Sequence, residues 1–172
     1  MNFLELAKKR CSTRNYTDQK VEPEKLAKIL EAARVAPTGV NAQAFKLLVL
    51  QEEESLKKLE DAAKFYSAPL AVIVCADVEK CWHRSFDGKV ISDIDASIVS
   101  AHMVLEATEL GLASLWICRF KEDVLREQFH SPDGLVPVNL TVFGYPGEPL
   151  KSAERHDTER KPLDELVVKE SF

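Results

Sequence analysis

Short continuous runs of apolar residues predict the strands of a β-sheet. FKLLVL (45–50) and PLAVIVCA (69–76) are rich in aliphatic and β-branched side chains, and the second has no charged or amide position. ASLWIC (113–118) and VPVNLTVFGYP (136–146) follow later in the chain. A short, wholly apolar strand is typical of the interior of a sheet that is covered on both faces, so we expect 69–76 to be such a strand.

Apolar residues at helical spacing predict the helices that separate these strands. The first helix extends from Asn2 to Arg10, and the second begins at Pro23, because proline favours the first turn of a helix. Two shorter helices are expected around Leu56 and from Glu122 onward. The second helix has one apolar face, formed by Leu26, Ile29, Leu30 and Ala33.

The run IDASIVSAHMVLEATEL, from Ile94 to Leu110, has apolar residues on nearly all sides. This pattern predicts a helix buried in the middle of the molecule or at a subunit interface, ended by Gly111 as a C-terminal cap. His102 lies within it and is expected to be a hydrogen-bonded core or interface residue. The mixture of elements predicts an α+β fold, with helices packed on a mainly antiparallel or mixed sheet.

Composition narrows the classes of protein to consider. Apolar residues make up 45% and charged residues 30% of the 172 residues, as in globular proteins. The absence of repeats or a Gly/Pro/Ser-rich linker predicts a single domain, 1–172. The net charge of −5 is spread along the chain without a basic block, which argues against nucleic acid as a partner. No segment approaches the roughly 18 apolar residues of a membrane span. We expect a cytoplasmic protein with no membrane partner.

The cysteines predict neither a disulfide framework nor a metal site. Cys11, Cys75, Cys81 and Cys118 are far apart in the chain, and a cytoplasmic protein keeps its thiols reduced. Cys81 and His83 lack a recognised ligand spacing. We expect Cys118 to be a small buried residue, and the alternative is a redox-active thiol.

The segment KRCSTRNY carries the first candidate chemistry. In an extended segment the side chains of Arg10, Ser12 and Arg14 point to one side. Two guanidinium groups and a hydroxyl that converge in this way suit a phosphate dianion. The alternative is a solvated connector without a ligand.

The segment APTGVNAQ carries the second set of candidate binding residues. Pro37, Thr38 and Gly39 predict a rigid turn that leaves backbone groups free, and Asn41 and Gln43 add amides that both donate and accept hydrogen bonds. A ring edge with alternating donors and acceptors, such as the pyrimidine end of a flavin, needs such groups. The alternative is a helix C-cap followed by a polar loop.

Together, and in this order, the two segments resemble the nitroreductase family of FMN-dependent oxidoreductases, and the resemblance covers essentially the whole chain. The R-x-S-x-R pattern matches the family's N-terminal motif, and APTGVNAQAF matches its second motif with Ala44 and Phe45 in place of Pro and Trp. Two further similarities are ATELGLASLWIC, a buried helix that ends in glycine before a strand, and FGYPGEPL before a basic tail.

The resemblance implies a nitroreductase-like fold and a homodimer with FMN sites at the subunit interface, with the C-terminal tail reaching the partner. Arg10 and Ser12, with Cys11 between them, would hold the phosphate together with Arg160, while Arg14 would lie near the pyrimidine ring. The other subunit would supply Pro37, Thr38, Gly39 and Asn41. The segment formed by Leu115, Trp116, Ile117 and Cys118 would pass under the central ring.

The activity implied is transfer of hydride from NAD(P)H, through flavin N5, to an electron-poor acceptor such as a nitroaromatic compound or a quinone. The chain has neither GxGxxG nor GxxxxGK[ST], which agrees with a nicotinamide nucleotide that binds only transiently. No catalytic side chain is assigned.

Three departures from the family pattern affect the expected cofactor contacts, and the first keeps an alternative open. Cys118 and Arg119 stand where many members have Glu-Gly beside N5. Thr158 stands where a basic residue often precedes the tail arginine, and the usual Asn and Lys contacts to the flavin ring have no clear counterpart, Lys64 being the one candidate. The alternative is a protein of the same fold that stores, senses or carries flavin without turnover. Phe65, Tyr66, Trp82 and Phe86 are candidates for a substrate pocket and equally for the core.

Overall fold

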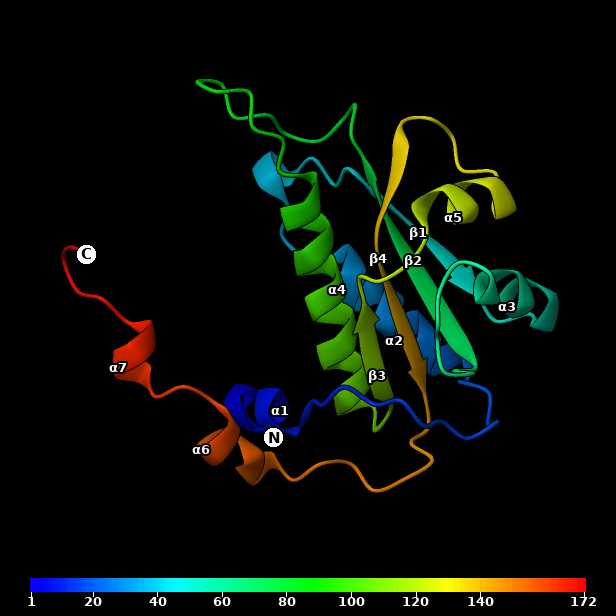
Figure 1. Ribbon diagram of the computed structural model, residues 1–172, viewed down its shortest axis with the longest axis horizontal. Coiled ribbons are helices and arrows are strands. Elements are labelled where there is room, and N and C mark those ends of the chain that lie inside the picture. Colours follow the sequence, from blue (N-terminus) through cyan, green and yellow to red (C-terminus); the bar gives the residue numbers. More distant parts are fainter.

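A four-stranded antiparallel sheet forms the centre of the computed structural model, which describes all 172 residues (Figure 1). The strand order across the sheet is β1-β2-β4-β3, so β1 and β3 are the edges. The strands are β1 (Phe45–Leu50), β2 (Leu70–Asp77), β3 (Ala113–Ile117) and β4 (Leu135–Gly144). The prediction of an α+β fold on a mainly antiparallel sheet is confirmed.

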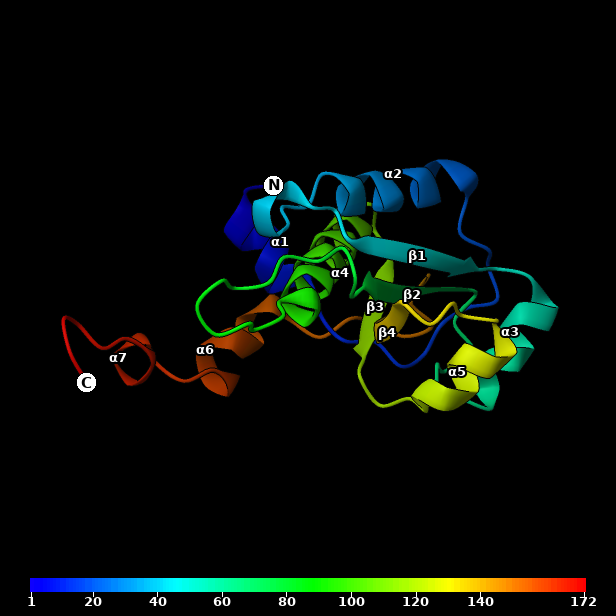
Figure 2. The same cartoon turned by 90° about the horizontal axis from the view of Figure 1, so that it is seen from above.

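Helices cover both faces of this sheet. Figure 2 shows α2 on one side of the strands and α3 with α5 on the other, while α4 packs on the same face as α2. The helices are α1 (Phe3–Lys9), α2 (Pro23–Arg34), α3 (Glu53–Glu60), α4 (Ser92–Glu109), α5 (Glu122–Gln128), α6 (His156–Glu159) and α7 (Leu163–Leu166). All of the predicted helices are present, with ends that differ from the prediction by one or two residues.

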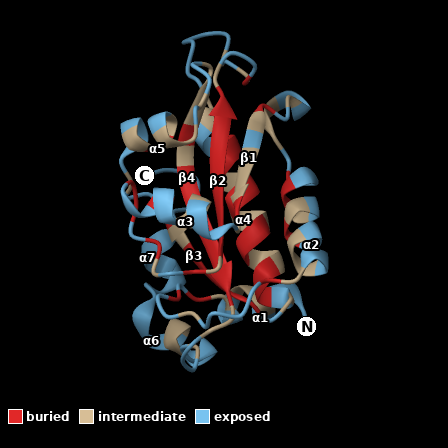
Figure 3. Cartoon of the chain, turned by 90° about the vertical axis from the view of Figure 1, so that its right-hand side faces the viewer, coloured by how far each residue is buried: buried red, intermediate tan, exposed pale blue.

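Strand β2 lies at the centre of two cores. All eight of its residues are buried, as Figure 3 shows along its length. Because side chains alternate across a strand, Leu70, Val72 and Val74 pack toward α2 and α4, whereas Ala71 and Ile73 belong to the second core under α3 and α5. The predicted burial of this strand on both faces is confirmed.

Helix α4 is buried on one side only within this chain. Val99, Met103 and Ala107 are fully buried against the sheet, whereas Ile94 is 50% exposed. The chain itself therefore does not cover this helix all round, and its burial at a subunit interface, the second of the two predicted alternatives, stays a prediction. His102 is half-buried, and its Nδ1 lies 2.8 Å from the carbonyl oxygen of Ile98.

Gly111 ends α4 as predicted. Its φ of 77° is in the left-handed region that closes many helices. Two backbone hydrogen bonds are made there: Leu112 N–H donates to the Ala107 carbonyl oxygen at 2.8 Å, and Gly111 N–H donates to that of Thr108 at 3.2 Å. This turn leads the chain directly from α4 into β3. It therefore fixes where the edge strand begins.

The C-terminal segment returns past α1 and then leaves the body of the molecule. Arg155 donates a hydrogen bond from Nη2 to the carbonyl oxygen of Arg10 at 2.7 Å. Every residue from Asp157 onward is exposed, and α7 projects outward in Figure 1. No helix in the protein has both the length and the apolar character that crossing a membrane requires.

Candidate functional site

The segment that follows α1 runs along the edge strand β3. Ser12 forms a parallel bridge with Ser114, and Thr13 N–H donates to the carbonyl oxygen of Ser114 at 3.0 Å. Its side chains alternate as predicted, since Cys11 and Thr13 are buried and Ser12 and Arg14 are exposed. The bridge to β3 thus turns the polar side chains of this segment to one side.

These polar side chains form one wall of a small pocket, which we call the cationic pocket. Its volume is about 210 Å³. The opposite wall comes from the C-terminal segment, which is held against α1 by the Arg155–Arg10 hydrogen bond and by His156, whose Nε2 lies 3.1 Å from the Lys8 carbonyl oxygen. The pocket is lined by Arg10, Cys11, Ser12, Arg14, Lys151, Arg155, His156, Glu159 and Arg160.

Positive charge in the cationic pocket is largely uncompensated. Burial lowers the pKa of the Arg10 guanidinium, and the neighbouring charges of Arg155 and Arg160 lower it further. None of these three arginines forms an ion pair, and the only carboxylate in the lining is that of Glu159. Like charges gathered in this way favour a bound anion, because its negative charge relieves their mutual repulsion.

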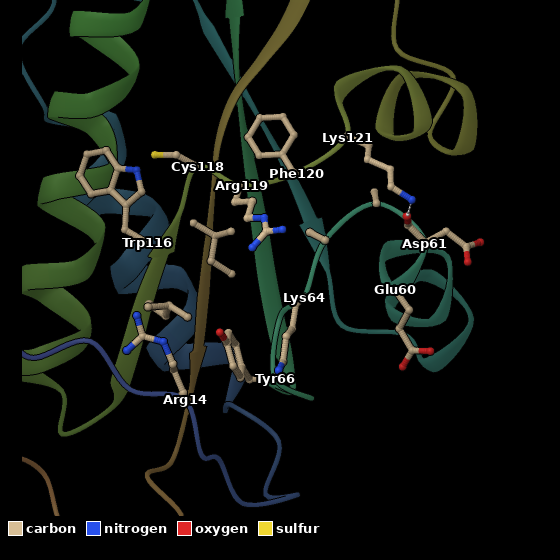
Figure 4. Close-up of a pocket in the computed structure, with 14 residues that line it drawn as sticks. Arg14, Glu60, Asp61, Lys64, Tyr66, Trp116, Cys118, Arg119, Phe120 and Lys121 are labelled. Carbon is tan, nitrogen blue, oxygen red and sulfur yellow. Dashed lines mark hydrogen bonds between the residues drawn. The ribbon is translucent and has the colours of Figure 1, made fainter.

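Arg14 also lines a larger hollow beside the cationic pocket, which we call the β3 cleft. Its volume is about 730 Å³, within the range of small-molecule sites. The end of β3 and the residues after it form one side, and the segment after α3 forms the other, as Figure 4 shows. The cleft is lined by Arg14, Glu60, Asp61, Ala62, Ala63, Lys64, Tyr66, Leu115, Trp116, Ile117, Cys118, Arg119, Phe120 and Lys121.

Two backbone contacts frame the β3 cleft. At one end the Ser12–Ser114 bridge covers the edge of β3. At the other end Phe120 bridges Ala63, and Lys121 N–H donates to the Ala62 carbonyl oxygen at 2.9 Å. Since β3 is an edge strand, the stretch between these contacts faces the cleft.

The segment Pro37–Gln43 does not reach either hollow of its own chain. It lies beside the first turn of α4, where Gly39 N–H donates to Asp95 Oδ1 at 3.0 Å. Helix α1 and the cationic pocket lie toward the other end of α4. Because α4 has 18 residues, the two ends are about 27 Å apart. One chain therefore brings Arg10, Ser12 and Arg14 together with the β3 segment and keeps the second predicted motif apart from them.

The conformation of this loop differs from the prediction. Gly39 N–H is not free, because it is bonded to Asp95, and Gln43 N–H donates to Thr38 Oγ1 at 3.0 Å. Val40 and Asn41 have φ values of 46° and 57°, in the left-handed region. Asparagine adopts this conformation more readily than most residues, whereas it is strongly unfavourable for the β-branched Val40. Such backbone strain is typical of functional loops.

Two site features were not anticipated from the sequence. Cys118 is exposed in the β3 cleft, so the prediction of a buried cysteine is wrong, since the strand has ended at Ile117 and no element covers the thiol. Arg155 was missed as part of the cationic pocket, although the cluster of basic residues in KSAERHDTER was a signal. Arg160 lies in the cationic pocket of its own chain, without help from a partner.

Comparison with known proteins identifies the chain's relatives. The model of the nitroreductase family matches residues 7–65 and 62–145. The chain belongs to the nitroreductase family. A solved structure of a family protein from Clostridium difficile 630 is 55% identical, with a TM-score of 0.98 and complete coverage of both chains. The nitroreductase fold is therefore established over the full length.

Other relatives carry functional names. A solved structure from Clostridium difficile R20291, named an FMN-dependent nitroreductase, is 30% identical, with a TM-score of 0.81, and the match covers 97% of this chain and 98% of that one. A Bacillus subtilis (strain 168) protein named FMN reductase [NAD(P)H] is 27% identical over 156 residues, which cover 80% of this chain and 63% of the relative.

Proposed function

We propose that this nitroreductase family protein is an FMN-dependent oxidoreductase, which transfers hydride from NAD(P)H to an electron-poor acceptor such as a nitroaromatic compound or a quinone. The observation that carries the proposal is the junction of the cationic pocket with the β3 cleft at Arg14. A ligand with a phosphate at one end and a flat ring at the other fits a site of this shape and charge. The FMN-dependent relative supports the assignment.

The donor set of the cationic pocket suits a phosphate. Arg10, Arg155 and Arg160 offer guanidinium groups without ion-pair partners, and Ser12 offers a hydroxyl. The lowered pKa of Arg10 reflects burial next to like charges, a state that a bound dianion would relieve. Many family members have a basic residue at the position of Thr158. We infer that Arg155 supplies the corresponding positive charge in this chain.

The β3 cleft suits the ring. Leu115, Trp116 and Ile117 give an apolar wall, while Arg14 brings a positive charge to the side next to the cationic pocket. When bound, FMN would supply the hydride and electron transfer, and the protein would supply position and electrostatics. The wall of β3 would hold the ring flat and keep water from it, and Arg14 would stabilise negative charge on the pyrimidine side.

We infer that two chains form each site. The strained loop around Gly39, with Pro37, Thr38 and Asn41, lies about one length of α4 away from the cationic pocket of its own chain. In a two-fold dimer the same loop of a partner would complete the site. The half-exposed side of α4 and the apolar residues of the tail provide surface for such an interface.

The state of the thiols supports a proposal about the compartment. All four cysteines are free, and three of them are buried. Thiols persist in this state in a reducing compartment. We therefore propose a cytoplasmic location.

Two measurements test the proposed function. The purified protein should show the absorbance bands of a bound flavin. On anaerobic mixing with NADH or NADPH the flavin band should bleach within seconds, and a nitroaromatic compound or quinone should then restore it. A stable flavin band with either nucleotide would support the alternative of a protein that stores, senses or carries flavin, and a colourless protein that does not bind added FMN would contradict both.

A further inference from the structure

His156 makes two polar contacts, one with α1 and one with an arginine of the cationic pocket. Its Nε2 lies 3.1 Å from the carbonyl oxygen of Lys8, and its Nδ1 lies 3.4 Å from Nε of Arg160. Figure 1 shows α6, which begins at this histidine, beside α1. The half-buried imidazole therefore lies between the body of the molecule and Arg160.

These two contacts determine the form of the imidazole ring. A carbonyl oxygen only accepts hydrogen bonds, so Nε2 must carry the proton that it donates to Lys8. The Nε of an arginine only donates, so Nδ1 must be free of a proton to accept from Arg160. Only the neutral ring with its proton on Nε2 satisfies both neighbours, because an imidazolium would place two donors face to face at Nδ1. His156 thus gives the cationic pocket an acceptor without adding positive charge.

The contact at Nε determines which edge of the Arg160 guanidinium remains for a ligand. Its terminal nitrogens, Nη1 and Nη2, form no hydrogen bond or ion pair in the chain, and the residue lines the cationic pocket. Parallel N–H groups at this edge match two oxygens of a phosphate. The edge that His156 leaves free is therefore one that can bind a phosphate through two hydrogen bonds.

Arg160 gains more than most residues from such a restraint. It is exposed and extended in backbone conformation at the end of α6, and ordering a long side chain on binding costs free energy. A contact that already exists before binding lowers this cost. Glu159 lines the same pocket and offers a competing carboxylate, but Arg160 forms no ion pair with it.

We propose that His156 is a positioning residue for the phosphate of FMN. It holds Nε of Arg160 through Nδ1, so that the edge formed by Nη1 and Nη2 meets the phosphate. This role rests on the proposed function. It is distinct from holding the C-terminal segment against α1, which uses the other nitrogen of the ring.

A double-mutant cycle tests whether His156 acts through Arg160. The full chain is titrated with FMN, and binding is followed by the quenching of flavin fluorescence. His156→Leu, which has neither donor nor acceptor, should raise the Kd for FMN about fivefold to tenfold. In the Arg160→Ala background the same substitution should change the Kd by less than about twofold, because the group through which it acts is gone. Equal fold-changes in the two backgrounds would overturn the proposal.

Two further variants separate positioning from a general disturbance of α6. His156→Gln keeps one donor and one acceptor and should raise the Kd for FMN by no more than about threefold. Thr158→Val changes the same helix at a side chain outside the pocket and should bind FMN as the wild type does. A loss in either variant as large as that in His156→Leu would contradict a positioning role.

Riboflavin, which has the same ring system without the phosphate, distinguishes this inference from the proposed function. His156→Leu should change the Kd for riboflavin by less than about twofold, since the residue acts only on the phosphate. A wild-type protein that binds neither FMN nor riboflavin would contradict the proposed function. If the protein binds FMN, but His156→Leu weakens FMN and riboflavin equally, the function stands and the positioning role is wrong.

Discussion

Arg155 shows how one side chain can hold two parts of a site together. It donates from Nη2 to the Arg10 carbonyl oxygen and from Nη1 to the Ser152 carbonyl oxygen at 2.6 Å, so it ties the C-terminal segment to the end of α1. Its charge also contributes to the lowered pKa of Arg10. The residue thus shapes the cationic pocket and adds to its charge.

We predict that Arg10→Ala and Arg155→Ala each weaken FMN binding. Loss of a charge-assisted hydrogen bond to a partly buried phosphate corresponds to about 1.5–3 kcal/mol, or roughly a tenfold to hundredfold increase in Kd. Titration of the apoprotein with FMN measures the change. Arg34→Ala is a matched control, because Arg34 is exposed and pairs with Glu31 on α2. Unchanged affinity in both pocket variants would contradict the assignment of the phosphate site.

We predict that Cys75 makes the free energy of unfolding decrease at alkaline pH. Burial raises the pKa of this thiol from 9.0 to about 11. Below pH 9 the thiol is protonated in both the folded and the unfolded chain, so the stability associated with its burial is fully present. Between pH 9 and 11 only the unfolded chain ionises, and the free energy of unfolding should fall by about 2–3 kcal/mol.

Urea unfolding at several pH values tests this expectation. Cys75→Ala should lose less stability than the wild type between pH 9 and 11. Cys118→Ala should follow the wild-type curve, because the thiol that it removes is exposed. If Cys75→Ala also follows the wild-type curve, another group is responsible for the alkaline loss.

The sequence predicts an element well when the pattern that specifies it lies within the element itself. Strand β2 is a continuous apolar run, and Gly111 supplies the left-handed residue that ends α4. The strand order and the pairing of Ser12 with Ser114 could not be predicted, because they depend on contacts between segments about 100 residues apart. The R-x-S-x-R motif can be recognised because its residues are adjacent in the sequence, whereas Arg155 was missed because it is 145 residues away from Arg10, which it contacts.

The loop around Gly39 is held by α4. Asp95 is 2% exposed, its Oδ1 accepts the Gly39 N–H, and its Oδ2 has no hydrogen-bond partner. A Cβ atom at Gly39 would lie 2.4 Å from Cδ1 of Ile91, so the loop also packs tightly against the segment before α4. The strained conformation of Val40 is therefore kept by contacts on either side of it.

We predict that Asp95→Ala weakens FMN binding about tenfold, because Gly39 N–H loses its acceptor and the loop loses its fixed conformation. Asp95→Asn keeps an acceptor at Oδ1 and should retain more affinity. FMN titration of the two variants, with light scattering to verify that their mass is unchanged, measures the effect. Wild-type affinity in Asp95→Ala would show that this hydrogen bond does not position the loop for the ligand.

At the scale of the whole molecule, the exposed apolar side chains are concentrated on a few elements. Phe3 and Leu4 on α1 and Ile94 on α4 are at least 50% exposed, as are Leu163 and Leu166 on the tail. A hollow of about 650 Å³ between α1, α2 and α4 adds further apolar surface. Obligate dimers typically bury on the order of 2,000–5,000 Å² of accessible surface in total, and their interfaces are more apolar than transient ones.

The tail offers a test of the dimer that leaves the cationic pocket intact, since the pocket ends at Arg160. Leu163 is 76% and Leu166 61% exposed, so their substitution removes no core contact within the chain. We predict that Leu163→Ser combined with Leu166→Ser shifts the protein toward monomer and raises the Kd for FMN by at least about tenfold, because the partner's loop around Gly39 leaves the site.

The control variant, Asp164→Ser with Glu165→Ser, changes polar positions of the same helix α7 and should remain dimeric. Light scattering at low micromolar concentration gives the mass, and FMN titration gives the affinity. A monomeric double-leucine variant with wild-type affinity would show that one chain forms the complete site, and the two-chain arrangement would then be wrong.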